Sequence, residues 1–212
     1  MAGILAADQS AIQRAARCIN EGGVVAFPTA SSYGLAVDGF SVQGVERLST
    51  LKRRPESQPF PLLVRDRAMA ENVVGELSEI AAELVGEHWP GPLTLVARPV
   101  RALPAPVVSE LGVGVRVSHH PTARRLVEAV GRPITCTSAN LSGSPAAETA
   151  AEVQARIGPQ VDLILEGDCG GNPPSTVVKP WAWGIEVLRT GPVAVNPQKG
   201  MTHSPISRDW LP

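Results

Sequence analysis

The sequence predicts a single α/β domain with a mixed β-sheet, followed by a short tail. Three observations predict this class. Short aliphatic runs alternate with segments of helical periodicity along the chain. Composition does not change between residues 1 and 195, whereas the tail 196–212 holds three prolines and little periodicity. Only 4% of the 212 residues are aromatic, so the core must be mainly Val, Leu, Ile and Ala.

The first part of the chain carries recognisable helix starts and stops. Asp8 and Ser41 can each cap a helix N-terminus, and Gly22 follows the first helical stretch as a stop. Pro55 and Pro59 forbid helix in their segment. The predicted order is helix 8–20, strand 24–27, hydroxyl-rich turn 29–34, extended segment 35–38, helix 41–51, loop 52–59 and strand 60–64.

The second part continues the alternation. Pro121 suits the first turn of a helix that Gly131 ends, and Thr149 can cap the helix after it. The predicted helices are 66–74, 78–87, 121–130 and 149–157, and the predicted strands are 93–97, 113–117, 134–137, 163–165, 175–178 and 185–188. Because ligands in open α/β sheets bind beyond strand ends, the polar loops there should converge on one cleft: 29–34, 52–59, 138–143 and 167–175.

Composition and motifs exclude several classes of protein. The net charge of −1 argues against a dedicated nucleic-acid binder. Three widely spaced cysteines predict neither disulfides nor a zinc site, and they suit the cytoplasm. No signal peptide, no run of 18 apolar residues, no Walker A motif and no GxGxxG motif is present. The four histidines have no metal-ligand spacing, so no protein-bound metal is predicted.

The cluster Lys52-Arg53-Arg54 is the strongest local charge signal, and two interpretations stay open. It can be a solvated helix end whose cations complement the helix dipole. Alternatively it holds phosphate groups, with arginine supplying a planar fork and lysine a point charge. Pro55 restricts the backbone just after the cluster, which favours preorganisation.

Other polar candidates also have two interpretations. Arg116 lies within an apolar strand, so it either faces solvent or faces a cleft, where it would suit a carboxylate or bicarbonate. Ser138, Asn140 and Ser142 can form an ordinary polar turn or a binding loop, and Ser175 has the same alternatives.

Seven short segments, taken together, closely resemble the YrdC/TsaC family of threonylcarbamoyl-AMP synthases. They follow the order and spacing of that family over about residues 10–193. The segments are 27–35 (FPTASSYGL), 52–55 (KRRP) with Pro59, 89–95 (WPGPLTL), 115–117 (VRV), 137–143 (TSANLSG), 175–178 (STVV), and 188–189 with Gly191.

The resemblance implies a YrdC-like domain over residues 1–195: a twisted, open, mixed sheet with flanking helices and a concave, positively lined cleft. It implies a nucleotidyltransferase that joins L-threonine, bicarbonate and ATP into threonylcarbamoyl-AMP and releases pyrophosphate, with Mg²⁺ carried by the ATP. The product would serve the t6A modification at adenosine 37 of tRNA. Transfer RNA and the downstream threonylcarbamoyl transferase are therefore further expected partners, and a membrane is not.

The resemblance also implies roles for single residues. Lys52 and Arg54 would hold phosphates as the catalytic cations, because negative charge accumulates on phosphorus during the reaction. The implied ATP-binding set is Lys52, Arg54, Gln58, Asn140, Ser142 and Arg189, and the implied threonine and bicarbonate set is Ser31, Tyr33, Arg116, Ser138 and Ser175.

This chain departs from the family pattern in its hydroxyl-rich turn. Ala30 stands where an acid is usual, Ser31 replaces a threonine, and Ser32 replaces an apolar residue. Gln58 and Glu148 are smaller departures. Two alternatives therefore remain: an RNA-binding module that uses the same basic cleft, and a divergent paralogue that acts on another carbamate.

Overall fold

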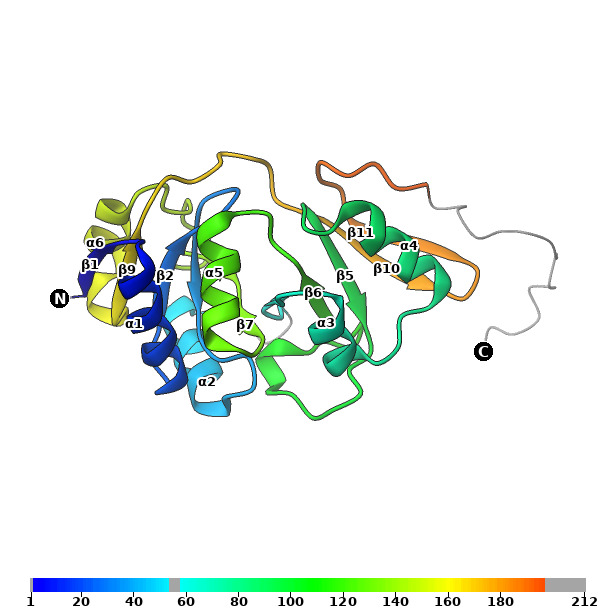
Figure 1. Cartoon of the computed structure of the whole chain (residues 1–212), viewed down its shortest axis with the longest axis horizontal. Coiled ribbons are helices and arrows are strands. Elements are labelled where there is room, and N and C mark those ends of the chain that lie inside the picture. Colours follow the sequence, from blue (N-terminus) through cyan, green and yellow to red (C-terminus); the bar gives the residue numbers. More distant parts are fainter. Residues whose placement is uncertain (1, 54–57, 197–212) are drawn as a thin grey trace.

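The strands form two open sheets instead of the single sheet predicted, within the same α/β class (Figure 1). This is a computed structural model, and it describes residues 2–53 and 58–196. The first sheet has the order β1 (Gly3–Ala6), β9 (Leu163–Glu166), β2 (Val25–Pro28), β3 (Tyr33–Ala36), β8 (Thr137–Ser138). The second has the order β11 (Gly184–Arg189), β10 (Thr176–Trp181), β5 (Leu93–Ala97), β6 (Val113–Arg116), β4 (Leu62–Leu63), β7 (Ile134–Thr135). Both contain parallel and antiparallel pairs.

The chain crosses from one sheet to the other at Cys136. The predicted strand 134–137 is split there, because β7 pairs with β4 of the second sheet while β8 pairs with β3 of the first. The amide of Cys136 donates to the carbonyl of Pro61, 2.9 Å away. The run 134–138 changes its partner strand at a single residue, and so short a run shows no change of periodicity there. For this reason the sequence predicted one sheet.

The helix predictions hold closely because helix ends depend on nearby residues. The side chains of Asp8, Ser41 and Thr149 accept hydrogen bonds from backbone amides three residues on, as N-caps do. The helices are α1 (Gln9–Asn20), α2 (Val42–Lys52), α3 (Arg67–Val74), α4 (Glu79–His88), α5 (Pro121–Val130) and α6 (Ala150–Ile157), with 3-10 turns η1 (Ala105–Val107) and η2 (Gly158–Gln160).

Several boundaries differ from the prediction. Lys52, predicted in a loop, is the last residue of α2, and Arg53 ends that helix with a left-handed φ of 48°. Strand β3 starts at Tyr33, inside the predicted turn, because Tyr33 pairs with Pro28 on β2. Strand β4 spans two residues rather than 60–64, since neighbouring prolines lack the N–H that a ladder needs. Strand β1 was not predicted; four residues give too short a pattern.

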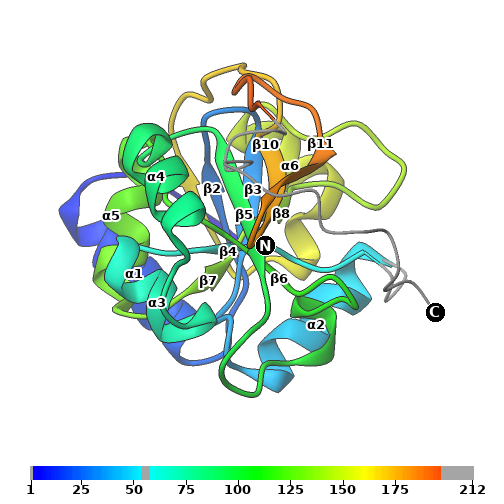
Figure 2. The same cartoon turned by 90° about the vertical axis from the view of Figure 1, so that its right-hand side faces the viewer.

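Helices cover both sides of the strands, and one core joins the two sheets. Figure 2 shows α1, α3, α4 and α5 on one side and α2 and α6 on the other. The buried cluster is largely aliphatic, as predicted, and its aromatic members are Phe27, Tyr33 and Phe60. No helix in the described part of the chain is long and apolar enough to cross a membrane.

Candidate active site

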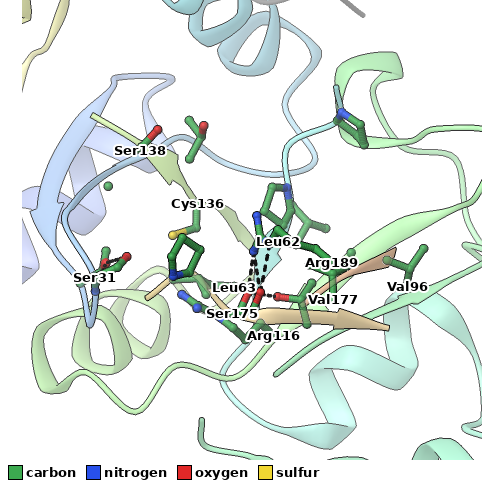
Figure 3. A pocket seen from close by; sticks show the side chains of 18 of the residues that line it. Ser31, Leu62, Leu63, Val96, Arg116, Cys136, Ser138, Ser175, Val177 and Arg189 are labelled. Atoms are coloured by element: carbon green, nitrogen blue, oxygen red, sulfur yellow. Dashed lines mark hydrogen bonds between the residues drawn. The ribbon is translucent and has the colours of Figure 1, made fainter. Parts of the chain in front are cut away.

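A cavity of about 1260 Å³ opens between the two sheets, and residues of both sheets line it (Figure 3). Loops 29–34, 138–143 and 167–175 all contribute, as the sequence predicts, whereas loop 52–59 contributes only Pro59 among its described residues. Seven of the predicted site residues line the cavity: Ser31, Tyr33, Arg116, Ser138, Asn140, Ser175 and Arg189.

Among the described residues, two arginines supply the positive charge of the cavity. Arg116 ends β6 and Arg189 ends β11. Burial lowers the pKa of Arg189, and the nearby charge of Arg116 lowers it further. Neither arginine forms an ion pair with any residue in the ranges 2–53 and 58–196. Like charges held close together with no described carboxylate paired to either make a site that suits an anion.

Ser175 is the centre of a hydrogen-bonded group beside these arginines. Arg189 donates from Nε and Nη2 to the Ser175 carbonyl, at 3.1 and 2.8 Å, and from Nη2 to the Ser175 hydroxyl at 3.1 Å. The Ser175 hydroxyl also lies 2.8 Å from the hydroxyl of Thr94 on β5. Figure 3 shows Arg116, Ser175 and Arg189 close together on one side of the cavity. The sequence reasoning missed Thr94, although a polar residue inside the apolar run 93–97 was the signal for it.

The hydroxyl-rich turn on the opposite side is held rigidly by hydrogen bonds. The Thr29 hydroxyl donates to the carbonyl of Ser32 at 2.7 Å and accepts from the amide of Ser31 at 3.2 Å. The loop 167–174 connects β9 of the first sheet to β10 of the second and is called the crossover loop below. Its amides donate three hydrogen bonds to the carbonyls of residues 29–31. A Cβ at Gly170 would lie 2.5 Å from the carbonyl oxygen of Ala30, so only glycine allows this approach.

Tyr33 lines the cavity, but its hydroxyl already has partners. It donates to the carbonyl of Gly167 at 2.9 Å and accepts from the amide of the same residue at 3.1 Å. Burial raises the pKa of this phenol. The hydroxyl therefore ties β3 to the loop 167–174.

Lys52 lies behind the cavity wall and is only 2% exposed. Its Nζ donates to the Ser138 carbonyl at 2.6 Å and to Oδ1 of Asn140 at 2.5 Å. The carbonyl of Lys52 also accepts from the amide of Ser142. Lys52 thus holds the loop 138–143 against the end of α2.

The remaining predicted site residues either do not line the cavity or lie outside the described residues. Ser142 and Gln58 are exposed and are not among the lining residues. Arg54 lies outside the described residues. The binding roles of these three, like those of the residues above, stay predictions.

Cys136 is the thiol in the cavity wall. Burial raises its pKa, although the charge and hydrogen bond of Arg116 oppose this shift. The thiol is therefore protonated near neutral pH, and it is poorly suited to act as a nucleophile.

The lining residues suit a metal ion that arrives with a nucleotide. No group of three or more His, Cys, Asp or Glu side chains in the described ranges is arranged to hold a metal ion. The cavity does contain two carboxylates, Glu110 and Glu148. Mg²⁺ often binds through substrate phosphates with one or two carboxylates and water, so these residues fit a nucleotide-borne ion.

The family model named Sua5/YciO/YrdC, with the description "Telomere recombination", matches residues 17–191. A protein called threonylcarbamoyl-AMP synthase from Photobacterium profundum is 34% identical over 184 residues, which cover 85% of this chain and 98% of that protein.

Solved structures are similar as well. Sua5 of P. abyssi in complex with L-threonine is 34% identical with a TM-score of 0.80, over 85% of this chain and 54% of that one. This chain therefore spans about half of that Sua5. YciO of E. coli is 28% identical with a TM-score of 0.82, over 93% of this chain and 100% of that one.

Proposed function

Because the chain belongs to the Sua5/YciO/YrdC family, we propose that it is an enzyme that makes threonylcarbamoyl-AMP. Its substrates are L-threonine, bicarbonate and ATP, and pyrophosphate is the second product, which makes it a nucleotidyltransferase. The observation that carries this proposal is the cavity between the sheets, where Arg116 and Arg189 lie close together beside the Ser175 hydroxyl and which Ser138 also lines.

The reaction divides into two steps that need no protein nucleophile. The threonine amine attacks the carbon of bicarbonate, or of CO₂ derived from it, to form a carbamate with loss of water. A carbamate oxygen then attacks the α-phosphorus of ATP, and the bond to pyrophosphate breaks. Both steps gather negative charge in the cavity, so fixed cations and positioning supply the catalysis.

The residue roles in this proposal are those that the family resemblance implies. Arg116, Ser31, Tyr33, Ser138 and Ser175 hold threonine and its carboxy group, while Asn140 and Arg189, with Ser142 and Gln58, hold ATP. Arg54 contributes charge to the phosphates. Lys52 contributes charge too, and it keeps Ser138 and Asn140 in place through its hydrogen bonds.

A magnesium ion carried by ATP would neutralise part of the triphosphate charge. Glu148 is the lining carboxylate that could hold it beside the nucleotide. We further propose that the product passes in the cytoplasm to a threonylcarbamoyl transferase that modifies adenosine 37 of tRNA.

The test is pyrophosphate release by the purified chain, with each substrate omitted in turn. Release should require threonine, bicarbonate and ATP together, and mass spectrometry should find threonylcarbamoyl-AMP. Release that does not depend on threonine would exclude this activity.

Two further experiments test the alternatives, a divergent paralogue and an RNA-binding module. Ala30 and Ser32 differ from the family pattern, so serine should be tested in place of threonine; a preference for serine would indicate a divergent paralogue. Direct tRNA binding should weaken steeply with salt if the cavity arginines hold phosphates. Binding that persists at roughly half-molar salt would contradict that contact.

A further inference from the structure

We propose that Thr94 is a positioning residue that makes the Ser175 hydroxyl a fixed hydrogen-bond donor to an oxygen of the anionic substrate. The inference deepens the proposed function and rests on it. It concerns a residue that lines the cavity without an assigned role.

Neighbouring strands bring the two hydroxyls together. Strand β5 runs parallel to β10, with Thr94 opposite Val177, and Ser175 directly precedes β10. The two oxygens are 2.8 Å apart, and the residues are only 5% and 6% exposed. A hydrogen bond so well buried holds both side chains in one orientation.

Counting donors and acceptors decides what Ser175 can do. A serine hydroxyl has one hydrogen to donate and two lone pairs to accept with. Arg189 Nη2 donates to one lone pair. When Thr94 donates to the other, the acceptor capacity of Ser175 is filled, and its hydrogen is left for a ligand.

This arrangement is suited to an anion. Ser175 lies beside the two cavity arginines, so an anion attracted by them presents oxygen acceptors to its hydroxyl (Figure 3). A carboxylate, or the carboxylate end of a carbamate, has acceptor oxygens only, whereas an amine or an ammonium group would compete as a donor. Thr94 therefore favours binding of the acidic part of the substrate by orienting the Ser175 hydroxyl, and it does not contact the substrate itself.

The experiment is Thr94→Val in the pyrophosphate assay. Valine keeps the methyl group, which packs near Gly114, and removes the hydroxyl. We expect KM for threonine to rise about tenfold, because one hydrogen bond to a charged group is weakened, with KM for ATP nearly unchanged. Thr94→Ser should restore most of the affinity, and Thr122→Val on α5, outside the cavity lining, is the matched control.

A double-substitution cycle separates positioning from a general structural effect. If Thr94 acts through Ser175, adding Thr94→Val to Ser175→Ala should change KM for threonine no further. Additive losses would overturn the inference. Melting temperatures show whether the variants fold, and Thr94→Ala replaces Thr94→Val if valine does not.

The outcomes distinguish the two proposals. If the wild-type chain shows no threonine-dependent release of pyrophosphate, the proposed function itself is wrong. If the wild type turns over normally and Thr94→Val has the same KM for threonine, only the role of Thr94 is overturned.

Discussion

At the scale of single residues, the cavity keeps two arginines together at a cost in stability. Arg116 and Arg189 repel each other, and no described carboxylate pairs with either. Arg132 is a useful contrast, because its Nη1 pairs at 3.0 Å with Asp38, which is 6% exposed. We expect the two cavity arginines to serve binding, whereas Arg132 stabilises the fold through its ion pair.

Arg116→Met should therefore weaken substrate binding without weakening the fold. We expect KM for threonine or bicarbonate to rise at least about tenfold, since a charge-assisted hydrogen bond is lost. The melting temperature should stay the same or increase, because the repulsion with Arg189 disappears. Arg132→Met should lower the melting temperature and leave KM for threonine and bicarbonate unchanged. A clear loss of stability in Arg116→Met would contradict this division of roles.

Lys52 combines charge with support of the loop 138–143. Lys52→Met leaves the Ser138 carbonyl and the buried Asn140 Oδ1 without this donor, which should cost about 1–3 kcal/mol in unfolding free energy. Turnover should fall strongly, because both residues line the cavity. Urea unfolding and the pyrophosphate assay measure the two effects. Lys179→Met, outside the lining residues, is the control and should keep turnover.

At the scale of elements, the crossover loop 167–174 joins the two sheets over one edge of the cavity. Its amides bond to the turn 29–31, and Nε2 of His120, just before α5, lies 3.0 Å from the Asp168 carbonyl. The other ring nitrogen of His120 is buried and has no partner among the described residues. The loop is therefore fastened to the turn 29–31 and to the start of α5, and the second contact is made by a titratable group.

This fastening predicts a pH-dependent stability. Burial lowers the pKa of His120 below its ordinary 6.5, and the charge of His119 adds to the effect. The unfolded chain then binds the proton more readily, so the stabilisation is complete above about pH 6.5 and is lost as pH falls below it. Urea midpoints measured from pH 7.5 to 5 should show this slope in the wild type and an only slightly smaller slope in His119→Gln, because burial is the main cause of the pKa shift. In His120→Gln the slope should be smaller; an equal slope would exclude His120 as its source.

At the scale of the whole molecule, the two sheets share one core. The buried cluster includes Ile164 and Phe27 of the first sheet and Leu95 and Val115 of the second. Residues 134–138 also run through both sheets, so neither has a separate interior. The cavity therefore lies between two sheets that share one core.

The two sheets should consequently unfold together. Trp89, Trp181 and Trp183 lie on or beside the second sheet, so their fluorescence reports that half. In a Trp210→Phe variant, which removes the tryptophan outside the described residues, the fluorescence transition should coincide with the loss of far-UV circular dichroism. Two separate midpoints would show that the sheets are independent.

Short-range signals predicted the helices and the residue types of the site. The caps at Asp8, Ser41 and Thr149 act within one turn, so a few neighbouring residues suffice to recognise them. The convergence of polar loops followed from the rule that sites lie at strand ends. The same reasoning could not place Lys52 behind the wall instead of inside the cavity, because its position depends on contacts with residues 86 and 88 positions away.

Chain order, patterning and the seven family-like segments were enough for the α/β class, the aliphatic core and the family, and they predicted an anion site. The division into two sheets, the pairing of Thr94 with Ser175 and the closeness of Arg116 to Arg189 came only from the folded structure. The physical reason is the same in each case. Strand partners and buried hydrogen bonds join residues far apart in the chain, and local propensity carries no information about which distant group will meet which.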